Sequence, residues 1–179
     1  MKIAVFGAGA IGSFYAGRLI QSGEEVSIVA RGRTRTAIAE KGLQIEGPGE
    51  TVRVQARHVA EDAVEIGAVD LVLVAVKAWQ IPAVAPILKP LVGPETRVLP
   101  LQNGVEAADQ LADVLGREHV LNGMTKVIVR TLSPGHIEDL GFEPLIAAGE
   151  LVGPPSTTRF SQWSLQPVVS DTESATCFG

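Results

Sequence analysis

A glycine-rich loop near the start of the chain constrains the fold more than any other feature. The apolar segment 2–6 has the pattern of a short strand, and a helical pattern begins directly after Gly7-Ala8-Gly9-Ala10-Ile11-Gly12. This is the G-x-G-x-x-G pattern, and it lies between a strand and a helix, which is the position in which the pattern indicates a dinucleotide-binding loop. Gly7 permits the turn, Gly9 lets a pyrophosphate approach the backbone, and Gly12 lets the helix lie close to the sheet. The free N–H groups and the helix dipole then predict a dinucleotide site, held by the backbone of residues 7–12.

Strand-like and helix-like segments alternate from residue 1 to about residue 115. We expect strands at 2–6, 26–30, 70–76 and 97–101, and helices at 10–21, up to 40, from about 82, and at 105–115. The run 70–76 is continuously apolar, which is typical of a central parallel strand covered on both faces. Segments 42–45 and 51–55 flank a turn cluster and predict a hairpin or a short crossing connection. The fold class is therefore α/β: a Rossmann-like, doubly wound, mostly parallel sheet.

The pattern changes after residue 120. Segments 126–132 and 135–140, joined by Ser133-Pro134-Gly135, and segment 145–148 have strand-like residues without intervening helices. They predict antiparallel edge strands added at the C-terminal end of the open sheet. From 156 to 179, nine of the 24 residues are Ser or Thr and no periodicity persists. We divide the chain into a dinucleotide-binding domain at 1–150 and a Ser/Thr-rich tail at 151–179 that is not recognisable as a catalytic domain.

Composition excludes several classes of partner. The net charge of −5 argues against nucleic acid, and no apolar run reaches membrane-spanning length. The single cysteine, Cys177, excludes an internal disulfide framework, and the N-terminal segment does not resemble a signal peptide. We therefore expect a cytoplasmic protein. One cysteine and three scattered histidines give no metal-ligand spacing, and we interpret His58, His119 and His136 as structural or solvated.

The residue after the second expected strand distinguishes among dinucleotides. Sites for NAD and FAD usually place an Asp or Glu about 20 residues past the loop, where it binds the ribose hydroxyls. This chain has Arg31 there, followed by Arg33 and Arg35. A guanidinium can pair with the 2′-phosphate of NADP in a bidentate fork. The alternative is a solvated basic turn, but the position favours NADP(H) over NAD(H) and disfavours FAD or S-adenosylmethionine.

Two polar segments follow later strands, at the sheet edge where open α/β sheets bind ligands. The first is Lys77, in Lys77-Ala78-Trp79-Gln80. Its cation could contact the ribose or the phosphates of a cofactor, or the carboxylate of a substrate. The alternative is that Lys77 is an ordinary loop lysine. Asn103, in Gln102-Asn103-Gly104, has a capping-box partner in Glu106 and can serve as a helix N-cap, a role that is compatible with facing the cleft.

The aromatic residues offer no catalytic arrangement. We expect Tyr15 to be packed or on a helix surface, and Trp79 and Trp163 to be packing residues. No Tyr-x-x-x-Lys pair occurs, which disfavours a short-chain-dehydrogenase mechanism.

Taken together, these motifs resemble the N-terminal, NADPH-binding domain of the ketopantoate reductase (2-dehydropantoate 2-reductase) family. The resemblance spans about residues 1–150. It rests on the glycine loop at the very start, Arg31 after the second strand, Lys77-Ala-Trp-Gln80, Gln102-Asn-Gly104, Gly135-His-Ile137 and the region of Ala148-Gly-Glu150. The loop alone is shared by many dehydrogenases, whereas the combination at these spacings is more specific.

The resemblance implies an oxidoreductase of the pantothenate pathway that uses NADPH to reduce the 2-oxo acid ketopantoate to the 2-hydroxy acid pantoate. Carried over by position, the segment from Gly7 to Gly12 holds the pyrophosphate and Arg31 holds the 2′-phosphate. Lys77 lies beside the cofactor, and Asn103 contacts its ribose and helps to orient the substrate.

The chain departs from the family pattern after Glu150. Family members continue into a helical C-terminal domain that carries the catalytic lysine, but no lysine follows Lys126 here. We therefore identify no catalytic residue and expect a truncated, frameshifted or fragmentary product that binds NADPH without turnover. With its helical domain absent, the region 139–152 would expose apolar residues and promote self-association. A non-catalytic NADP(H)-sensing module and a different NADP-linked hydroxyacid dehydrogenase remain alternatives.

Overall fold

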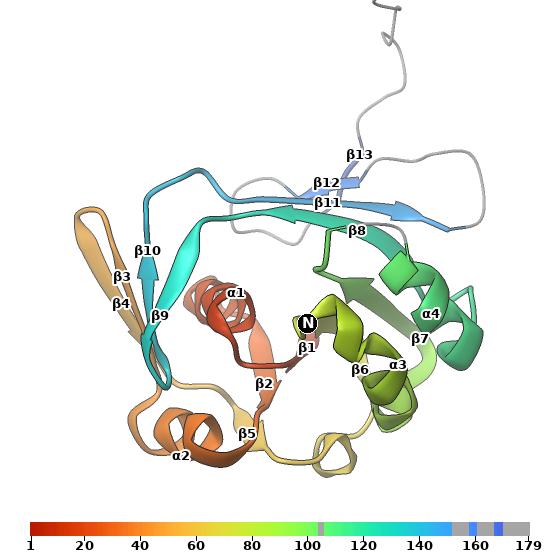
Figure 1. Cartoon of the computed structure of the whole chain (residues 1–179), viewed down its shortest axis with the longest axis horizontal. Coiled ribbons are helices and arrows are strands. Elements are labelled where there is room, and N and C mark those ends of the chain that lie inside the picture. The colour runs from red at the N-terminus through yellow and green to blue at the C-terminus, as the bar shows by residue number, and fades with distance from the viewer. Residues whose placement is uncertain (104–105, 152–157, 161–166, 170–179) are drawn as a thin grey trace, which may run out of the picture.

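The protein is described here by a computed structural model of residues 1–103, 106–151, 158–160 and 167–169 (Figure 1). Its centre is a five-stranded parallel sheet in the order β5-β2-β1-β6-β7. The strands are β1 (Lys2–Phe6), β2 (Glu25–Val29), β5 (His58–Ala60), β6 (Val69–Val74) and β7 (Val92–Pro100). Because β1 lies between β2 and β6, the strand order reverses at the end of β1, where an open α/β sheet binds its ligand. The Rossmann-like fold class is confirmed.

Helices cover both faces of this sheet, as the continuously apolar strands predicted. On β1, Ile3 and Val5 pack on one face in a cluster with Phe14 of α1 (Ala10–Gln21). Ala4 and Phe6 point to the opposite face and pack in the cluster that contains apolar residues of α4 (Glu106–Leu115). This alternation follows from the two-residue period of a strand. It places α1, and with it the glycine loop, on one face of the sheet.

The remaining helical segments are short. The second helix, α2 (Gly32–Lys41), follows β2, and one turn of 3₁₀ helix, η1 (Ala63–Glu65), precedes β6. The helix expected from about Pro82 is broken into η2 (Ala78–Gln80), α3 (Ile81–Val84) and η3 (Ala85–Leu91). Pro86 and Pro90 explain the break, because each removes a backbone donor that a continuing α-helix needs. None of the helices in the described part of the chain is both long and apolar enough to span a membrane.

The strands outside the central sheet form two further sheets, which corrects the expectation of edge strands on the open sheet. The hairpin of β3 (Leu43–Gly47) and β4 (Glu50–Val54) confirms the predicted turn cluster. It pairs through β3 with the second predicted hairpin, β9 (Val129–Ser133) and β10 (His136–Asp139), in the order β4-β3-β10-β9. The backbone edge of β3 is therefore satisfied by β10 and not by the central sheet.

The third sheet contains strands that the sequence pattern did not predict. Its order is β13-β12-β11-β8, from β8 (Leu121–Lys126), β11 (Leu145–Glu150), β12 (Thr158–Phe160) and β13 (Pro167–Val169). Within it β8 pairs antiparallel with β11 over six residue pairs. Part of the segment 151–179 thus forms backbone pairs with β11. The domain boundary at 150 stays a prediction.

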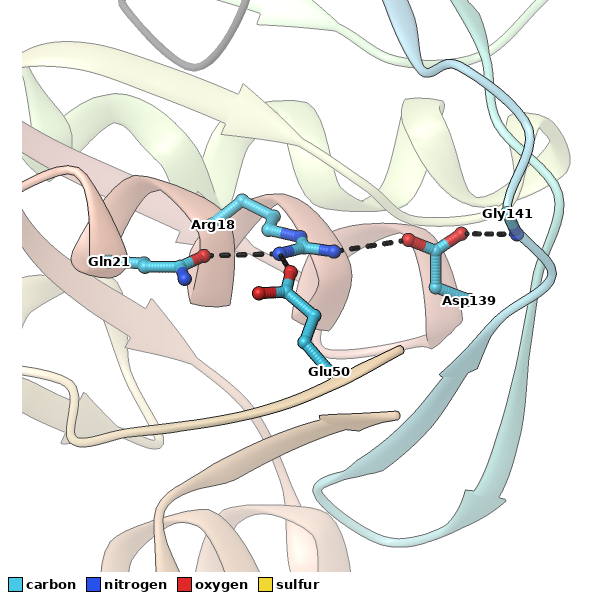
Figure 2. Close-up of polar contacts among 5 residues, drawn as sticks. All are labelled: Arg18, Gln21, Glu50, Asp139 and Gly141. Carbon is cyan, nitrogen blue, oxygen red and sulfur yellow. Dashed lines mark hydrogen bonds and ion pairs between the residues drawn. The ribbon is translucent and has the colours of Figure 1, made fainter. Parts of the chain in front are cut away.

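A buried arginine fixes α1 between the central sheet and the second sheet (Figure 2). Arg18 donates from Nη1 to the carboxylate of Glu50 and, at 3.1 Å, to Oε1 of Gln21, and from Nη2 to Oδ2 of Asp139 at 3.2 Å. Asp139 also accepts from the Gly141 N–H at 3.0 Å. The side chains of Arg18 and Asp139 are only 10% and 7% exposed, so this ion pair is shielded from solvent. It holds the helix that follows the glycine loop in a fixed position.

Candidate active site

Two adjoining cavities open at the carboxyl edge of the central sheet. The larger, of about 540 Å³, lies among the glycine loop, the end of β2 and the end of β6. The smaller, of about 250 Å³, lies among the ends of β6 and β7 and strand β8. Both are lined by Ile11, Ala75, Val76 and Lys77, so they form one continuous site.

The three glycines of the loop have three different structural roles. Gly7 has φ +102°, which side chains other than glycine rarely adopt, and its N–H donates to the Val29 carbonyl at 3.0 Å. A Cβ at Gly12 would overlap the carbonyl oxygen of Gly7, so only glycine lets the helix begin this close to the turn. A Cβ at Gly9 would meet nothing within 4 Å. The open side of the loop is therefore at Gly9, where the sequence predicted that a pyrophosphate approaches.

The N-terminus of α1 is suited to binding an anion. Its N-cap, Gly9, has no capping side chain, and no acidic residue lies in its first turn. The first N–H groups of a helix have no intrahelical partner and lie at the positive end of its dipole. Residues 7–11 line the larger cavity, whereas Gly12 is buried and lines neither cavity. The contribution of Gly12 is to allow the close packing of the loop.

Arg31 lies where the sequence placed it, at the rim of the larger cavity. It is the N-cap residue of α2, its side chain is exposed, and Thr34 lines the cavity beside it. Among the residues that line the two cavities, the charged side chains are Arg31 and Lys77, and no acidic residue is present. An anionic ligand would meet positive charge at Arg31 in the larger cavity and at Lys77, where the two cavities join.

Lys77 and Asn103 come together at the smaller cavity, as the shared sheet edge predicted. Both side chains are exposed, and both residues line this cavity. The Lys77 N–H donates to Oε1 of Gln80 at 2.9 Å, which explains why Gln80 follows at this spacing. The proposed N-cap role of Asn103 stays a prediction, because α4 begins at Glu106 and residues 104–105 lie outside the described part.

Gln102 and Thr125 also line the smaller cavity and were not assigned a role from the sequence. The buried Gln102 amide donates to the carbonyls of Val74 and Val76, at 3.0 and 2.7 Å, and so ties the end of β7 to the end of β6. Thr125 comes from β8, a strand that the sequence pattern did not predict. No local sequence signal marks Thr125, because β8 reaches the site only through tertiary packing.

The aromatic and histidine predictions have mixed outcomes. Tyr15 is packed, as expected: it is 5% exposed, and burial raises its pKa to about 12. Trp79 is 79% exposed and lines neither cavity, so the prediction that it packs is wrong. Trp163 lies outside the described residues.

The histidines lie away from both cavities. His119 contacts the Thr96 carbonyl, His58 lies near Glu65, and His136 near Glu46. Within the described ranges, no group of three or more His, Cys, Asp or Glu side chains could hold a metal ion.

Comparison with known proteins gives matches in sequence and in structure. The 2-dehydropantoate 2-reductase of Mesorhizobium japonicum is 42% identical over 106 residues, which cover 59% of this chain and 32% of that protein. The crystal structure of the Porphyromonas gingivalis 2-dehydropantoate 2-reductase superimposes with a TM-score of 0.80 at 29% identity, covering 87% of this chain and 56% of that one. D-Mandelate dehydrogenase with NADH and anilino(oxo)acetate gives a TM-score of 0.75 at 29% identity, covering 85% of this chain and 49% of that one.

The chain spans from about a third to just over half of the length of these relatives. A family model described as ketopantoate reductase PanE/ApbA matches residues 3–152, which is most of the chain. The resemblance noted from the sequence motifs is thereby confirmed: the chain belongs to the ketopantoate reductase PanE/ApbA family.

Proposed function

We propose that this chain is the NADPH-binding part of a reductase that converts a 2-oxo acid, ketopantoate, to the corresponding 2-hydroxy acid. The observation that carries this proposal is the continuous site at the carboxyl edge of the sheet. It runs from Arg31, past the open side of Gly9, to Lys77 and Asn103, and no acidic side chain lines it. Its two cationic side chains, Arg31 and Lys77, and the free N–H groups of the helix suit a phosphorylated dinucleotide.

Each part of the site has a distinct role in this proposal. The N–H groups at the start of α1 bind the pyrophosphate, and the Arg31 guanidinium pairs with the 2′-phosphate. Lys77 and Asn103 bind the ribose beyond the pyrophosphate, and the Asn103 amide orients the substrate. When bound, NADPH supplies the hydride for reduction of the carbonyl carbon. The residues of this chain contribute binding and orientation.

The preference for NADPH tests the role of Arg31. Arg31→Ala removes the charge-assisted hydrogen bonds to the 2′-phosphate but leaves the glycine loop unchanged. We expect NADPH affinity to fall by roughly ten- to a hundredfold and NADH affinity to change by less than about twofold. Isothermal titration calorimetry with both nucleotides measures the two affinities.

Arg33→Ala is the matched control for this experiment. Arg33 is also exposed and lies two residues away, but it lines neither cavity. It should leave both affinities unchanged. Equal losses in the two variants would mean that the general basic charge of this turn, and not Arg31, attracts the phosphate.

D-Mandelate dehydrogenase is a neighbour of this fold seen with NADH. An equal affinity of the wild-type chain for NADH and NADPH would contradict the proposed NADPH preference.

Turnover by this chain alone is expected to be absent. The family resemblance places the catalytic lysine after Glu150, and no lysine follows Lys126 in this sequence. Mixing the chain with NADPH and ketopantoate should therefore leave the absorbance of NADPH at 340 nm constant. Consumption of NADPH would show that an acid in this chain, with Lys77 the first to test, completes the reaction.

Two other functions would use the same site. The fold match to D-mandelate dehydrogenase favours a hydroxyacid dehydrogenase with another substrate, and a panel of 2-oxo acids tested on a full-length relative separates that function from ketopantoate reduction. A non-catalytic NADP(H)-sensing module would bind NADPH and change its association with a partner.

Self-association is expected from the apolar residues after β10. Leu140 and Phe142 are 45% and 54% exposed, whereas Ile146 and Ala148 are buried in the core. Exposed apolar side chains of this size favour association when they are contiguous with other apolar surface. Sedimentation velocity should show an average mass that rises with concentration, and Phe142→Ser should reduce that rise. A monomer at all concentrations would contradict this expectation.

A further inference from the structure

Three oxygen atoms meet beneath the smaller cavity. They are the Tyr15 hydroxyl from α1, the Thr125 hydroxyl from β8, and the Leu145 carbonyl from β11. The two hydroxyls are hydrogen-bonded to each other, and the Leu145 oxygen lies 3.2 Å from Thr125 Oγ1 and 3.4 Å from Tyr15 Oη. Tyr15 and Thr125 are 5% and 6% exposed, so solvent provides few competing partners. Of these three residues, Thr125 is the one that lines the cavity.

The number of available protons decides what Thr125 can offer to a ligand. The carbonyl of Leu145 can only accept, and each hydroxyl has one proton. One hydroxyl donates to the other, and the Leu145 carbonyl is the acceptor within reach of the second proton, so the triad can use both protons internally. The raised pKa of Tyr15 keeps its proton in place at neutral pH. In either arrangement, Thr125 Oγ1 retains at least one lone pair and has no proton for a ligand.

A ligand that contacts Thr125 Oγ1 must therefore be a hydrogen-bond donor. The two cavities share Ile11 and Val76. A dinucleotide with its 2′-phosphate at Arg31 and its pyrophosphate at Gly9 would therefore extend its other half into the smaller cavity. The nicotinamide ring has one donor group, the N–H₂ of its carboxamide. The carboxylate and the 2-oxo group of an oxo acid can only accept. The other donors that can reach this cavity are the ribose hydroxyls, which the proposed function places at Lys77 and Asn103, and the C4 hydroxyl of ketopantoate, which is absent from a complex with NADPH alone. In that complex the carboxamide N–H₂ is the donor available to Thr125.

We propose that Thr125, held in orientation by Tyr15, accepts a hydrogen bond from the carboxamide N–H₂ of the nicotinamide and so positions the ring of the cofactor. This inference rests on the proposed function. Fixing the carboxamide fixes the rotation of the ring about its bond to the ribose. It therefore determines which face of the ring is turned toward Asn103, which is proposed to orient the substrate.

The test compares two ligands that differ only at the proposed donor. The reduced 3-acetylpyridine analogue of NADPH has a methyl group in place of the carboxamide N–H₂ and cannot donate to Thr125. The wild-type chain should bind NADPH about three- to tenfold more tightly than this analogue, which is the usual contribution of one neutral hydrogen bond. Thr125→Val, which has the same shape but no hydroxyl, should bind the two ligands equally.

Further variants separate positioning from general damage to the structure. If a substitution only damaged the structure, it would lower the affinities for NADPH and for the analogue by the same factor and leave the ratio of the two affinities unchanged. Thr125→Ser should restore the preference for NADPH, because it keeps the hydroxyl. Thr131→Val, at an exposed position on β9, should leave both affinities as in the wild type. Tyr15→Phe should reduce the preference without abolishing it, since Thr125 then loses its orienting partner but keeps its oxygen.

The outcomes distinguish this inference from the function on which it rests. If the wild-type chain binds NADPH but Thr125→Val retains the same preference over the analogue, the role of Thr125 is wrong and the proposed function stands. If the folded wild-type chain binds neither NADPH nor the analogue, both are wrong. A preference that disappears in Thr125→Val and returns in Thr125→Ser supports the role of Thr125.

Discussion

Replacing Gly9 by alanine should abolish most of the affinity for NADPH and leave the fold intact. Gly9 has φ −72° and ψ −172°, a conformation that alanine adopts without strain, and its added Cβ meets no protein atom within 4 Å. The methyl group instead occupies the space through which the pyrophosphate reaches the helix N–H groups. Loss of these charge-assisted hydrogen bonds should weaken NADPH binding by roughly ten- to a hundredfold.

The stability of the Gly9→Ala variant should change little. Alanine is a poorer N-cap than glycine, so we expect a loss of about 1 kcal/mol or less and a fall in Tm of about 2–4 °C. Gly12→Ala is the contrasting variant, because its Cβ would overlap the Gly7 carbonyl and force the helix away from the turn. It should lose both stability, by about 3 kcal/mol, and binding. A Gly9→Ala variant that binds NADPH like the wild type would show that the phosphates do not lie at this loop.

The second large effect is expected at the buried ion pair that holds α1. Asp139→Asn leaves the Arg18 guanidinium buried without its enclosed carboxylate partner. Removal of one partner from a buried pair costs about 3–5 kcal/mol, and we expect the lower end, near 3 kcal/mol, because Arg18 still pairs with Glu50, whose side chain is half exposed. Urea unfolding followed by circular dichroism measures the change in the free energy of unfolding.

The neighbouring residue on the same strand provides the control. Glu138 forms an ion pair with Arg130, and these side chains are 29% and 65% exposed. Glu138→Gln should change the free energy of unfolding by less than about 1 kcal/mol, since solvent screens an exposed pair. Equal effects of the two substitutions would show that the Arg18–Asp139 pair contributes no more than a surface contact does.

The parts of the site that could be predicted are those coded by neighbouring residues. The glycine loop, the strand before it and the helix after it lie within the first 21 residues, and the structure places all three with the expected bounds. The position of Arg31 follows from the end of β2 in the same way. Lys77 and Asn103 were brought to one edge by topology, because parallel strands end on the same side of the sheet.

The parts that could not be predicted depend on contacts between distant residues. Tyr15 and Thr125 are 110 positions apart, and β8 has no clear alternating pattern, so nothing in the sequence indicates their hydrogen bond. The pairing of β3 with β10 could not be predicted for the same reason. Each hairpin has the sequence pattern of edge strands, and nothing in either sequence indicates that the backbone groups of β3 and β10 pair with each other. Trp79 was mispredicted for a related reason. A large aromatic side chain is expected to be buried, but the tertiary structure leaves this one exposed to solvent.

Calorimetric titration of the wild-type chain with NADPH tests the central claim most directly. The account predicts saturable binding of one NADPH per chain with a Kd in the micromolar range, about −8 kcal/mol, and weaker binding of NADH. Circular dichroism of the same sample establishes that the chain is folded. A folded chain that shows no heat of binding up to millimolar NADPH would contradict the claim that the glycine loop and its two cavities form a dinucleotide site.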